Sequence, residues 1–492
     1  MKFGERVKNM IKSWLDIQPA NPQVFRIDET TDFNTECIKN RIWYRGDSHE
    51  LSSFYSQLGY AEDTFWGITQ SADIRIKRSH TGLPKLLVQT IINTVVTDYS
   101  GDDGPAEEWK NAKIENNYDE LLKEILSGLL IIGDGALKLN YDESISKNVL
   151  FEWVDGDNID FVYERGKLIE TIFISYFDAN KKTYRLEEHY GYGYVKYKLY
   201  DQDKEVPLKT IEKLANLQNI EFDKSFMMAV PVFRNKSIKY KGRGESIFTG
   251  KYDSFDSLDE IVSQWLEAVR TGRAIKYIPQ NLIPRDETTG EMMTSNPFDN
   301  SFIKVEGSMQ EDSKNEIVIK QPEIPSDNYL QSYVTFLDLC LQGLVSPSTL
   351  GIDNKKLDNA EAQREKEKTT LYTRGAIIDI ISDFNNKVYK TVLQTYAALK
   401  KEPLPTNIAD ISSKFGEYNN PSFEAQIETI GKGKTNGILS LEASVEELYG
   451  DSKDDDWKKE EVARLKAEQG IIDMEEPAVN LDNNNINEVI NE

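Results

Sequence analysis

The chain of 492 residues is poor in the side chains that build disulfide and metal frameworks. It has two cysteines, Cys37 and Cys340, and three histidines, His49, His80 and His189, all far apart in the sequence. Disulfide scaffolds need several cysteines, and zinc sites need Cys and His at short fixed spacings. We therefore expect both cysteines to be packing residues in a reduced, cytoplasmic setting, and we predict no metal site and no cofactor.

The sequence also lacks an apolar run near the ~20 residues that a membrane span requires. Its first residues, MKFGERVKNMIKSWLDIQ, interleave Lys and Arg with single apolar residues, whereas a secretion signal has an unbroken apolar block. Apolar residues make up 39% and charged residues 29% of the chain, which is a globular balance. We expect a soluble protein of about two to four domains with no membrane partner.

The sequence also has fewer basic than acidic residues. There are 59 Lys and Arg against 83 Asp and Glu, so the net charge is −24. Proteins that hold nucleic acid usually present a basic face. An acidic surface suits a wall along which DNA slides without adhering, but it equally suits a protein kept in solution by its charge, which is the more common case. Net charge alone leaves both interpretations open.

Two patterns resemble catalytic motifs and fail closer inspection. Gly431–Thr435 carries half of a phosphate loop, but Glu428 stands where the loop needs glycine and the preceding residues indicate helix. Acidic neighbours such as Glu187-Glu188 arise by chance among so many acids, and we expect them on solvated faces. The run Asp451–Asp456 indicates the acidic start of a helix. We predict no catalytic residue.

Periodicity divides the first half of the chain into a helical and a β-rich part. Gly82 and Pro84 introduce a helix that we expect to continue to Gly101, and Tyr118–Ile132 predicts a second helix that ends at glycine. From about residue 136 to 233, β-branched and aromatic runs alternate with Asp-Gly and Asp-Asn turns, which is typical of an antiparallel meander. These features predict an α+β fold.

Long helices dominate the second half. Apolar spacings of three and four predict one helix over Asp253–Arg273, with Asp253 as its N-cap, and another over Asp327–Val345. The segment 274–325 between them is polar, contains several prolines and includes two strand-like pieces, FIKVE and EIVIK. A third helix over Asp358–Lys400 would span on the order of 60 Å.

The loop Ser346–Leu357 places Asn354, Lys355 and Lys356 between two long helices of an acidic chain. These lysines could contact passing phosphates, or they could simply keep an exposed loop soluble. The sequence leaves both alternatives open. The remaining chain predicts an extended segment over Pro403–Phe423, short helices from Ser422 to Gly470 divided at Gly431–Gly437 and Gly450–Asp456, and a disordered tail over 471–492.

Five stretches resemble the portal proteins of tailed bacteriophages, particularly long-tailed phages of Gram-positive hosts. They are RIWYRGDSHELSSFY (41–55), GRGESIFTGKYDSFDSLDEIVSQWLEAVRTGRA (242–274), SPSTLGID (346–353), NAEAQREKEKTTLYTR (359–374) and GILSLEASVEELYGDS (437–452). The resemblance extends from about residue 40 to 470. It rests on the order and spacing of the five strings taken together.

The resemblance implies an α+β subunit of a ring of about twelve copies at one capsid vertex. By position it assigns a helical and β-rich wing to 1–252, stem helices to 253–273 and 326–345, a clip to 274–325, a tunnel loop to 346–357, a long wing helix to 358–400, a wing return to 401–436 and a helical crown to 437–470.

It also implies a non-enzymatic channel for packaging and ejecting double-stranded DNA, resident in the virion and assembled in the host cytoplasm. The expected partners are the terminase large subunit, a head-tail adaptor, and the major capsid and scaffolding proteins. Under this reading the tunnel-loop residues Asn354, Lys355 and Lys356 would face DNA, and a clip docking surface would comprise Arg285, Asp286, Glu287, Lys304 and Glu306. The competing hypotheses are a metal-dependent phage nuclease and an oligomeric scaffold without a channel.

Overall fold

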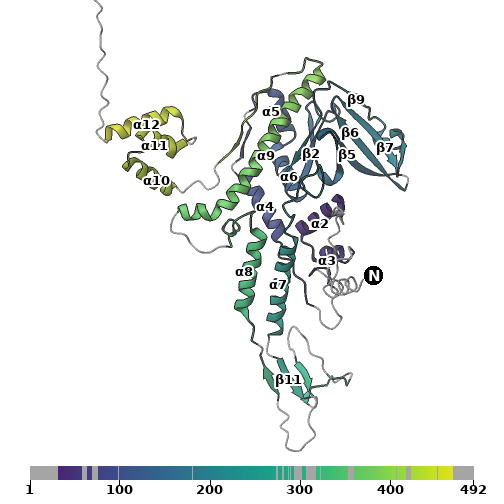
Figure 1. The fold of residues 1–492 in the computed structure, drawn as a ribbon, viewed down its shortest axis with the longest axis vertical. Coiled ribbons are helices and arrows are strands. Elements are labelled where there is room, and N and C mark those ends of the chain that lie inside the picture. Colours follow the sequence, from purple (N-terminus) through teal and green to yellow (C-terminus); the bar gives the residue numbers. More distant parts are fainter. Residues whose placement is uncertain are drawn as a thin grey trace, which may run out of the picture. The chain divides into compact units, whose positions relative to one another are not determined.

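The computed structural model has the predicted α+β fold (Figure 1). It describes residues 31–57, 64–68, 76–97, 99–102, 104–179, 181–272, 275–279, 282–285, 288, 290–292, 302–305, 317–321, 323–352, 360–405, 407–416, 423–450 and 453–468. The chain divides into an N-terminal unit, Met1–Asp353 with Thr369–Gly416, and a C-terminal unit, Asn354–Lys368 with Glu417–Glu492. The predicted tail 471–492 lies outside the described residues.

The described part of the N-terminal unit opens with helices that supply much of its core. They are α2 (Phe33–Arg45), α3 (Ser48–Gln57), α4 (Leu83–Val96), α5 (Glu107–Glu115) and α6 (Tyr118–Ile131). α6 confirms the predicted helix, and Leu122, Ile125, Leu126 and Leu129 are buried along its apolar face. α4 ends at Val96 instead of continuing to Gly101, because residues 99–102 form strand β1, which pairs with the distant strand β14 (Ser413–Phe415).

The β-rich lobe consists of two antiparallel sheets. One has the order β10-β2-β3, formed by Ala229–Phe233, Asp134–Asn140 and Leu150–Asp155. The other is a meander of β4 (Ile159–Glu164), β5 (Lys167–Ala179), β6 (Lys182–Gly191), β7 (Tyr194–Asp201) and β8 (Lys204–Val206), with β9 (Ile220–Glu221) beside β7. A two-residue turn joins β4 to β5, and both Arg165 and Gly166 have positive φ, as such hairpins require. The predicted meander is confirmed.

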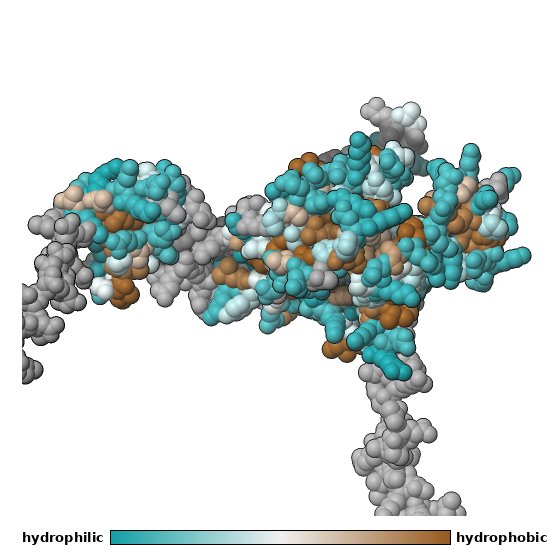
Figure 2. All heavy atoms as spheres, turned by 90° about the horizontal axis from the view of Figure 1, so that it is seen from above, coloured by the Kyte–Doolittle hydropathy of each residue, from teal (hydrophilic) through white to brown (hydrophobic). Residues whose placement is uncertain are grey.

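The predicted long helix is also confirmed. α9 (Ala360–Lys400) is 41 residues long and runs without interruption. Its buried face is a stripe of side chains at helical spacing, Ile377, Ile381, Phe384, Val388 and Val392. Tyr118 of α6 donates a hydrogen bond of 2.8 Å to Asn385 inside this core. Seen from above in Figure 2, the surface is mostly hydrophilic, with smaller apolar patches.

A helical hairpin extends from the N-terminal unit and carries a small sheet at its tip (Figure 1). It consists of α7 (Tyr252–Thr271) and α8 (Ser326–Leu341), with β11 (Ile275–Pro279), β12 (Phe302–Val305) and β13 (Val318–Lys320) between them. The two predicted strand-like pieces are confirmed as β12 and β13, and both pair with β11, which the sequence analysis missed.

Two predicted helix ends in the hairpin were wrong. Lys251, not Asp253, occupies the N-cap position of α7, so Asp253 lies in the first turn, where its charge favours the helix dipole. α8 ends at Leu341, four residues before the predicted Val345. Gly343 has a φ of 77° and turns the chain, so Leu344 and Val345 are buried as part of a loop.

The C-terminal unit contains α10 (Phe423–Thr435), α11 (Leu441–Tyr449) and α12 (Asp455–Glu468). α10 packs on α11 and lies in the same unit as the predicted crown, 437–470. The boundary assigned between the wing return and the crown at residue 436 therefore falls inside one helical unit. The half phosphate loop Gly431–Thr435 is the last part of α10, so the helix continues through the glycines where a division between helices was expected, and it ends at Thr435. Asp454 accepts a hydrogen bond from the Trp457 amide, which confirms the acidic start of α12.

Candidate functional site: the helical hairpin, its terminal sheet and their anchor

The two helices of the hairpin pack against each other in antiparallel orientation. At the base, the Lys251 Nζ atom donates hydrogen bonds to the carbonyl oxygens of Leu339 (2.8 Å) and Gln342 (2.9 Å). A cation at these carbonyls complements the negative end of the α8 dipole. Toward the tip, the rings of Trp265 and Tyr329 stack with centroids 6.1 Å apart. Contacts at both ends therefore fix the pairing of the helices.

The outward surface of the hairpin combines exposed apolar side chains with an excess of acid. The exposed fractions are 47% for Val269, 52% for Leu330, 47% for Val334 and 42% for Leu339. The acidic residues of the two helices that are not buried are Asp253, Asp256, Glu260, Glu267, Asp327 and Asp338, against a single cation, Arg270. Leu330 and Val334 lie one helical turn apart on α8, so these two exposed apolar side chains are neighbours.

The terminal sheet has the strand order β12-β11-β13. Strand β13 is an edge of this sheet, and three consecutive apolar residues there are exposed, Ile317 (52%), Val318 (45%) and Ile319 (62%). Edge strands are usually protected by charge, proline or a covering segment, because their free backbone groups pair readily with other chains. This sheet therefore offers a surface suited to protein contact.

The structure places only part of the predicted clip docking surface. Arg285 is exposed and forms an isolated β-bridge with Met292. Lys304 lies on β12 and is paired in register with Ile278 of β11. Asp286, Glu287 and Glu306 lie outside the described residues, as do the tunnel-loop residues Asn354, Lys355 and Lys356. Of that loop, the structure describes a 3-10 turn over Pro347–Leu350.

Two carboxylates of α7 hold the chain segments around residues 65 and 80 onto the base of the hairpin. Asp256 accepts the backbone N–H groups of Phe65 (2.8 Å) and Trp66 (3.3 Å). Asp259 is fully buried and accepts hydrogen bonds from the Trp66 indole, the His80 ring and both the N–H and hydroxyl of Thr81. Burial raises the pKa of Asp256 to about 6.

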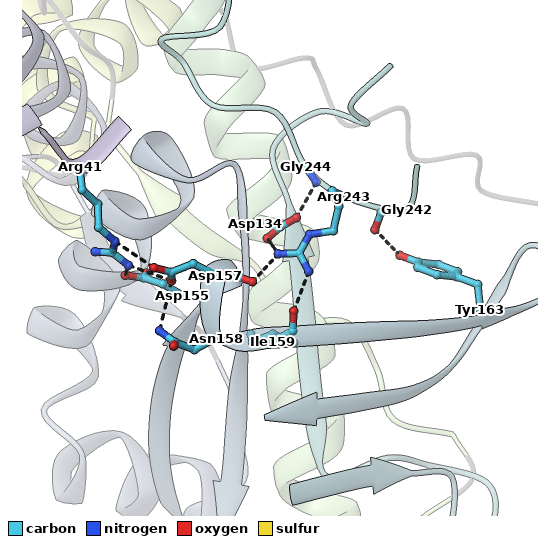
Figure 3. Close-up of polar contacts among 11 residues, drawn as sticks. Arg41, Asp134, Asp155, Asp157, Asn158, Ile159, Tyr163, Gly242, Arg243 and Gly244 are labelled. Carbon is cyan, nitrogen blue, oxygen red and sulfur yellow. Dashed lines mark hydrogen bonds and ion pairs between the residues drawn. The ribbon is translucent and has the colours of Figure 1, made fainter. Parts of the chain in front are cut away.

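A second network anchors the chain just before α7 (Figure 3). The Arg243 guanidinium donates to the Asp134 carboxylate at 2.8 Å and to the Ile159 carbonyl at 2.7 Å. Asp134 also accepts the Gly244 N–H at 2.6 Å, and burial, opposed by Arg243, raises the pKa of this carboxyl. Glycine is required at 244 because a Cβ there would lie 2.0 Å from the Gly133 carbonyl oxygen.

One acidic pair differs from the sequence expectation. Glu187 and Glu188 were expected on a solvated face, but both side chains are mostly buried, with exposed fractions of 16% and 13%. Glu188 pairs with the buried Lys138 at 3.0 Å, and Glu187 pairs with Arg185 and contacts the His189 ring. Arg185 and His189 are two residues from Glu187 on β6 itself, whereas Lys138 lies on β2 of the other sheet, so the partner of Glu188 could not be read from adjacent sequence. Both cysteines are free and buried, as expected.

Within the described ranges, His, Cys, Asp and Glu side chains nowhere gather in groups of three that could hold a metal ion. Over the same part of the chain, no helix is both long and apolar enough to cross a membrane. The elements that organise this region are thus the hairpin, its sheet, and two carboxylate anchors. This arrangement defines a body with a protruding helical hairpin that carries a small sheet.

No protein-family model matches the sequence, and no curated protein matches it. Among solved structures, the fold is similar to a chain of the virion of a native gene transfer agent (GTA) particle. The similarity covers 88% of this chain and 96% of that chain, at 11% sequence identity and a TM-score of 0.38.

Proposed function

We propose that this chain is a structural subunit of a tailed-phage particle and, more specifically, its portal. The observation that carries the proposal is the protruding hairpin with a sheet at its tip, set between a β-rich lobe and a helix of 41 residues. This is the order of elements that the sequence resemblance implies. In this reading α7 and α8 are the stem, the terminal sheet belongs to the clip, and α9 is the long wing helix.

The hairpin surface supports assembly into a ring. Leu330 and Val334 lie one helical turn apart on α8 and are about half exposed, so an isolated chain leaves them in water. Burial against another copy removes this apolar area from solvent at a gain of roughly 25 cal/mol per Å². Each subunit of a closed ring uses two different surfaces for its two neighbours, and the two helices of a hairpin provide two such faces.

The mechanism we propose is passive. Double-stranded DNA would pass through the centre of the ring, where the acidic excess of the hairpin disfavours tight phosphate binding. The terminal sheet would dock the terminase large subunit during packaging and a head-tail adaptor later, and capsid and scaffolding proteins would contact the body. ATP hydrolysis would belong to the motor, and this subunit would need no cofactor.

Light scattering of the purified chain, with and without a substitution in the hairpin, tests the proposal. We expect the wild-type particle to have a mass near that of twelve subunits. Val334→Asp combined with Leu339→Asp should raise the dissociation constant of the oligomer at least tenfold, because burying charge in the interface is costly. The matched control is Ile438→Asp, which changes a residue of the C-terminal unit that is 78% exposed.

A wild-type protein that stays monomeric at all concentrations contradicts the portal. Divalent-metal-dependent cleavage of duplex DNA by the purified protein, abolished by a carboxylate substitution, would favour the nuclease hypothesis instead. A large oligomer in which no central opening exists would favour the scaffold.

A further inference from the structure

The sequence contains an acid-free run of 21 residues over 224–244, and the structure folds the second half of this run into an exposed basic loop. No Asp or Glu occurs between Asp223 and Glu245, although acids make up 83 of 492 residues. The basic loop comprises residues 234–244 (RNKSIKYKGRG) and ends eight residues before α7 begins. Lys236, Lys239 and Lys241 are exposed, and Ile238 is 100% exposed. The basic loop was not predicted, although the acid-free run can be read directly from the amino-acid sequence.

The basic loop is held in one conformation from its base. An isolated β-bridge joins Lys236 to Gly244, and the Ser237 N–H donates to the Arg243 carbonyl at 2.9 Å. The Tyr240 hydroxyl donates to the Thr31 carbonyl at 3.0 Å. The Tyr163 hydroxyl likewise donates to the Gly242 carbonyl at 3.0 Å. A fixed loop loses little conformational entropy on binding, which favours its use in recognition.

Internal ion pairs engage several of the acids near the loop. Asp134 is paired with Arg243, and Asp155 and Asp157 are both paired with Arg41 at 2.8 and 2.9 Å (Figure 3). Lys239 is paired with Glu36 at 3.3 Å. Lys236 and Lys241 have no ion pair with the residues that the structure describes. The outward charge of the loop is therefore positive on a chain whose net charge is −24.

An acidic edge with exposed apolar residues lies elsewhere on the same unit. It is formed by the end of α5 and the loop between β2 and β3, which meet where Asn148 donates to Glu115 at 3.3 Å. Ile114 is 80% exposed and Ile145 is 71% exposed, with Glu115, Asp142 and Glu143 beside them in sequence and a single exposed cation, Lys147. Viewed from the end of the unit where α5 lies, apolar patches interrupt the hydrophilic surface (Figure 2).

The two surfaces lie at opposite ends of one sheet. Strand β2 starts at Asp134, beside Arg243 of the basic loop, and ends at Asn140, where the acidic edge begins. β10 runs antiparallel to β2 and leads directly into the basic loop, since Phe233 pairs with Asp134. A strand of this length spans on the order of 20 Å. The molecule thus carries two surfaces of opposite charge, each with an exposed isoleucine, at well-separated places.

We propose that the basic loop binds the acidic edge of a second copy of this chain, so that Ile238 packs near Ile114 and Ile145 while Lys236 and Lys241 face Glu115 and Glu143. This inference rests on the proposed ring and names the head-to-tail contact that joins each subunit to the next. Head-to-tail contacts need two different complementary surfaces on each subunit, which these two provide. Subunits of the same high negative charge repel one another, and one basic element facing an acidic edge offsets that repulsion locally.

A second copy fits the loop better than nucleic acid does. A phosphate backbone would be contacted by lysines alone, whereas a fully exposed isoleucine among them matches an apolar interface centre with a charged rim. Arg243, the side chain best suited to bidentate phosphate binding, is already occupied by Asp134 and two carbonyl groups.

A reciprocal charge exchange tests this contact. We expect Lys236→Glu with Lys241→Glu to raise the dissociation constant of the oligomer roughly tenfold or more, and Glu115→Lys with Glu143→Lys to do the same, because each variant faces like charge. Combining all four substitutions should restore association close to wild type. Lys204→Glu with Lys209→Glu, two exposed lysines elsewhere in the lobe, is the matched control. Circular dichroism of each variant checks that the fold is retained.

Four results would overturn the proposal, and they differ in which part of the account they leave intact. Wild-type rings that are unaffected by the loop variants, or not restored by the exchange, reject this contact but leave the portal intact. Rings that persist while the lysine variants lose binding to a duplex DNA probe assign the loop to nucleic acid. Carbodiimide cross-links from Lys236 or Lys241 found only within one chain, in a mixture of ¹⁴N and ¹⁵N protein, also reject it. A wild-type chain that never self-associates rejects the portal and this contact together.

Discussion

The body of the N-terminal unit and its hairpin differ in how far apolar side chains are buried and in how acidic side chains are paired. In the body, α6 and α9 bury their leucines, isoleucines and Phe384, and the buried Asp134 has a guanidinium partner. In the hairpin, valine and leucine side chains stand about half exposed and the acids outnumber the single arginine. The body therefore has a large core of its own, whereas the hairpin leaves apolar side chains in water that the proposed ring would cover.

The largest effect on stability is expected at the anchor of α7. Arg243→Ala would leave Asp134 buried without its partner, and we expect a loss of about 3–5 kcal/mol in the free energy of unfolding. Lys241→Ala, two residues away and exposed, should change it by less than about 0.5 kcal/mol. Urea unfolding measures both values. Equal small effects would mean that the network in Figure 3 does not anchor the hairpin.

A matched pair of leucines compares the body and the hairpin directly. Leu129→Ala removes a fully buried side chain from α6 and should cost about 2–5 kcal/mol. Leu330→Ala truncates a side chain on α8 that is 52% exposed, and should cost less than about 1 kcal/mol in the dissociated chain. Urea unfolding under dissociating conditions is the measurement. A large loss at Leu330 would show that the hairpin has a core of its own.

The titration of Asp256 tests how the base of the hairpin is held. Its pKa of about 6 lies above the ~3.9 of an exposed aspartate, so the folded state binds this proton more tightly. The protonated carboxyl therefore adds stability that is complete below about pH 4 and is lost as the pH rises through about 6.

Asp256→Asn cannot titrate and serves as the reference. The unfolding free energy of wild type minus that of the variant should increase by roughly 1–3 kcal/mol as the pH falls from about 7.5 to about 4.5. If this difference in unfolding free energy does not change with pH, the Asp256 carboxyl has the same pKa in the folded and unfolded states and is exposed to water.

The smallest expected effect is at the cap of α8. Lys251→Ala removes the ammonium group that binds the carbonyl oxygens of Leu339 and Gln342, and should cost about 0.3–1 kcal/mol. Lys251→Arg should retain most of this stabilisation. Amide hydrogen exchange over the last turn of α8 is the sensitive readout, and unchanged exchange in the alanine variant would mean that the pairing of the two helices does not depend on this cap.

Much of the fold was predictable because its signals are local. Helical periodicity identified α6, α7, α8 and α9, and strand alternation with turn residues identified the meander. Apart from misplaced helix ends, the failures were non-local. Strand β1 pairs with β14 from the other end of the unit, β11 is defined by its two partner strands, and Glu188 is buried because Lys138 lies on a neighbouring sheet.

The candidate site was less predictable than the fold. The hairpin was expected from periodicity, but which of its apolar residues face outward depends on how α7 and α8 pack. The sequence pattern carries no sign of the roles of Asp256 and Asp259, because only the folded chain brings Phe65, Trp66 and Thr81 onto them. The basic loop was missed because net charge averages over the whole chain, whereas a 21-residue run without acid is a local departure from it.

The most direct test of the central claim is electron microscopy of the purified chain with particles classified by rotational symmetry. The account predicts rings of about twelve subunits with a central opening, in which the hairpins of neighbouring copies lie side by side. Monomers or compact dimers over a wide range of salt and protein concentration would contradict it, because the exposed hairpin would then have no second copy to cover it.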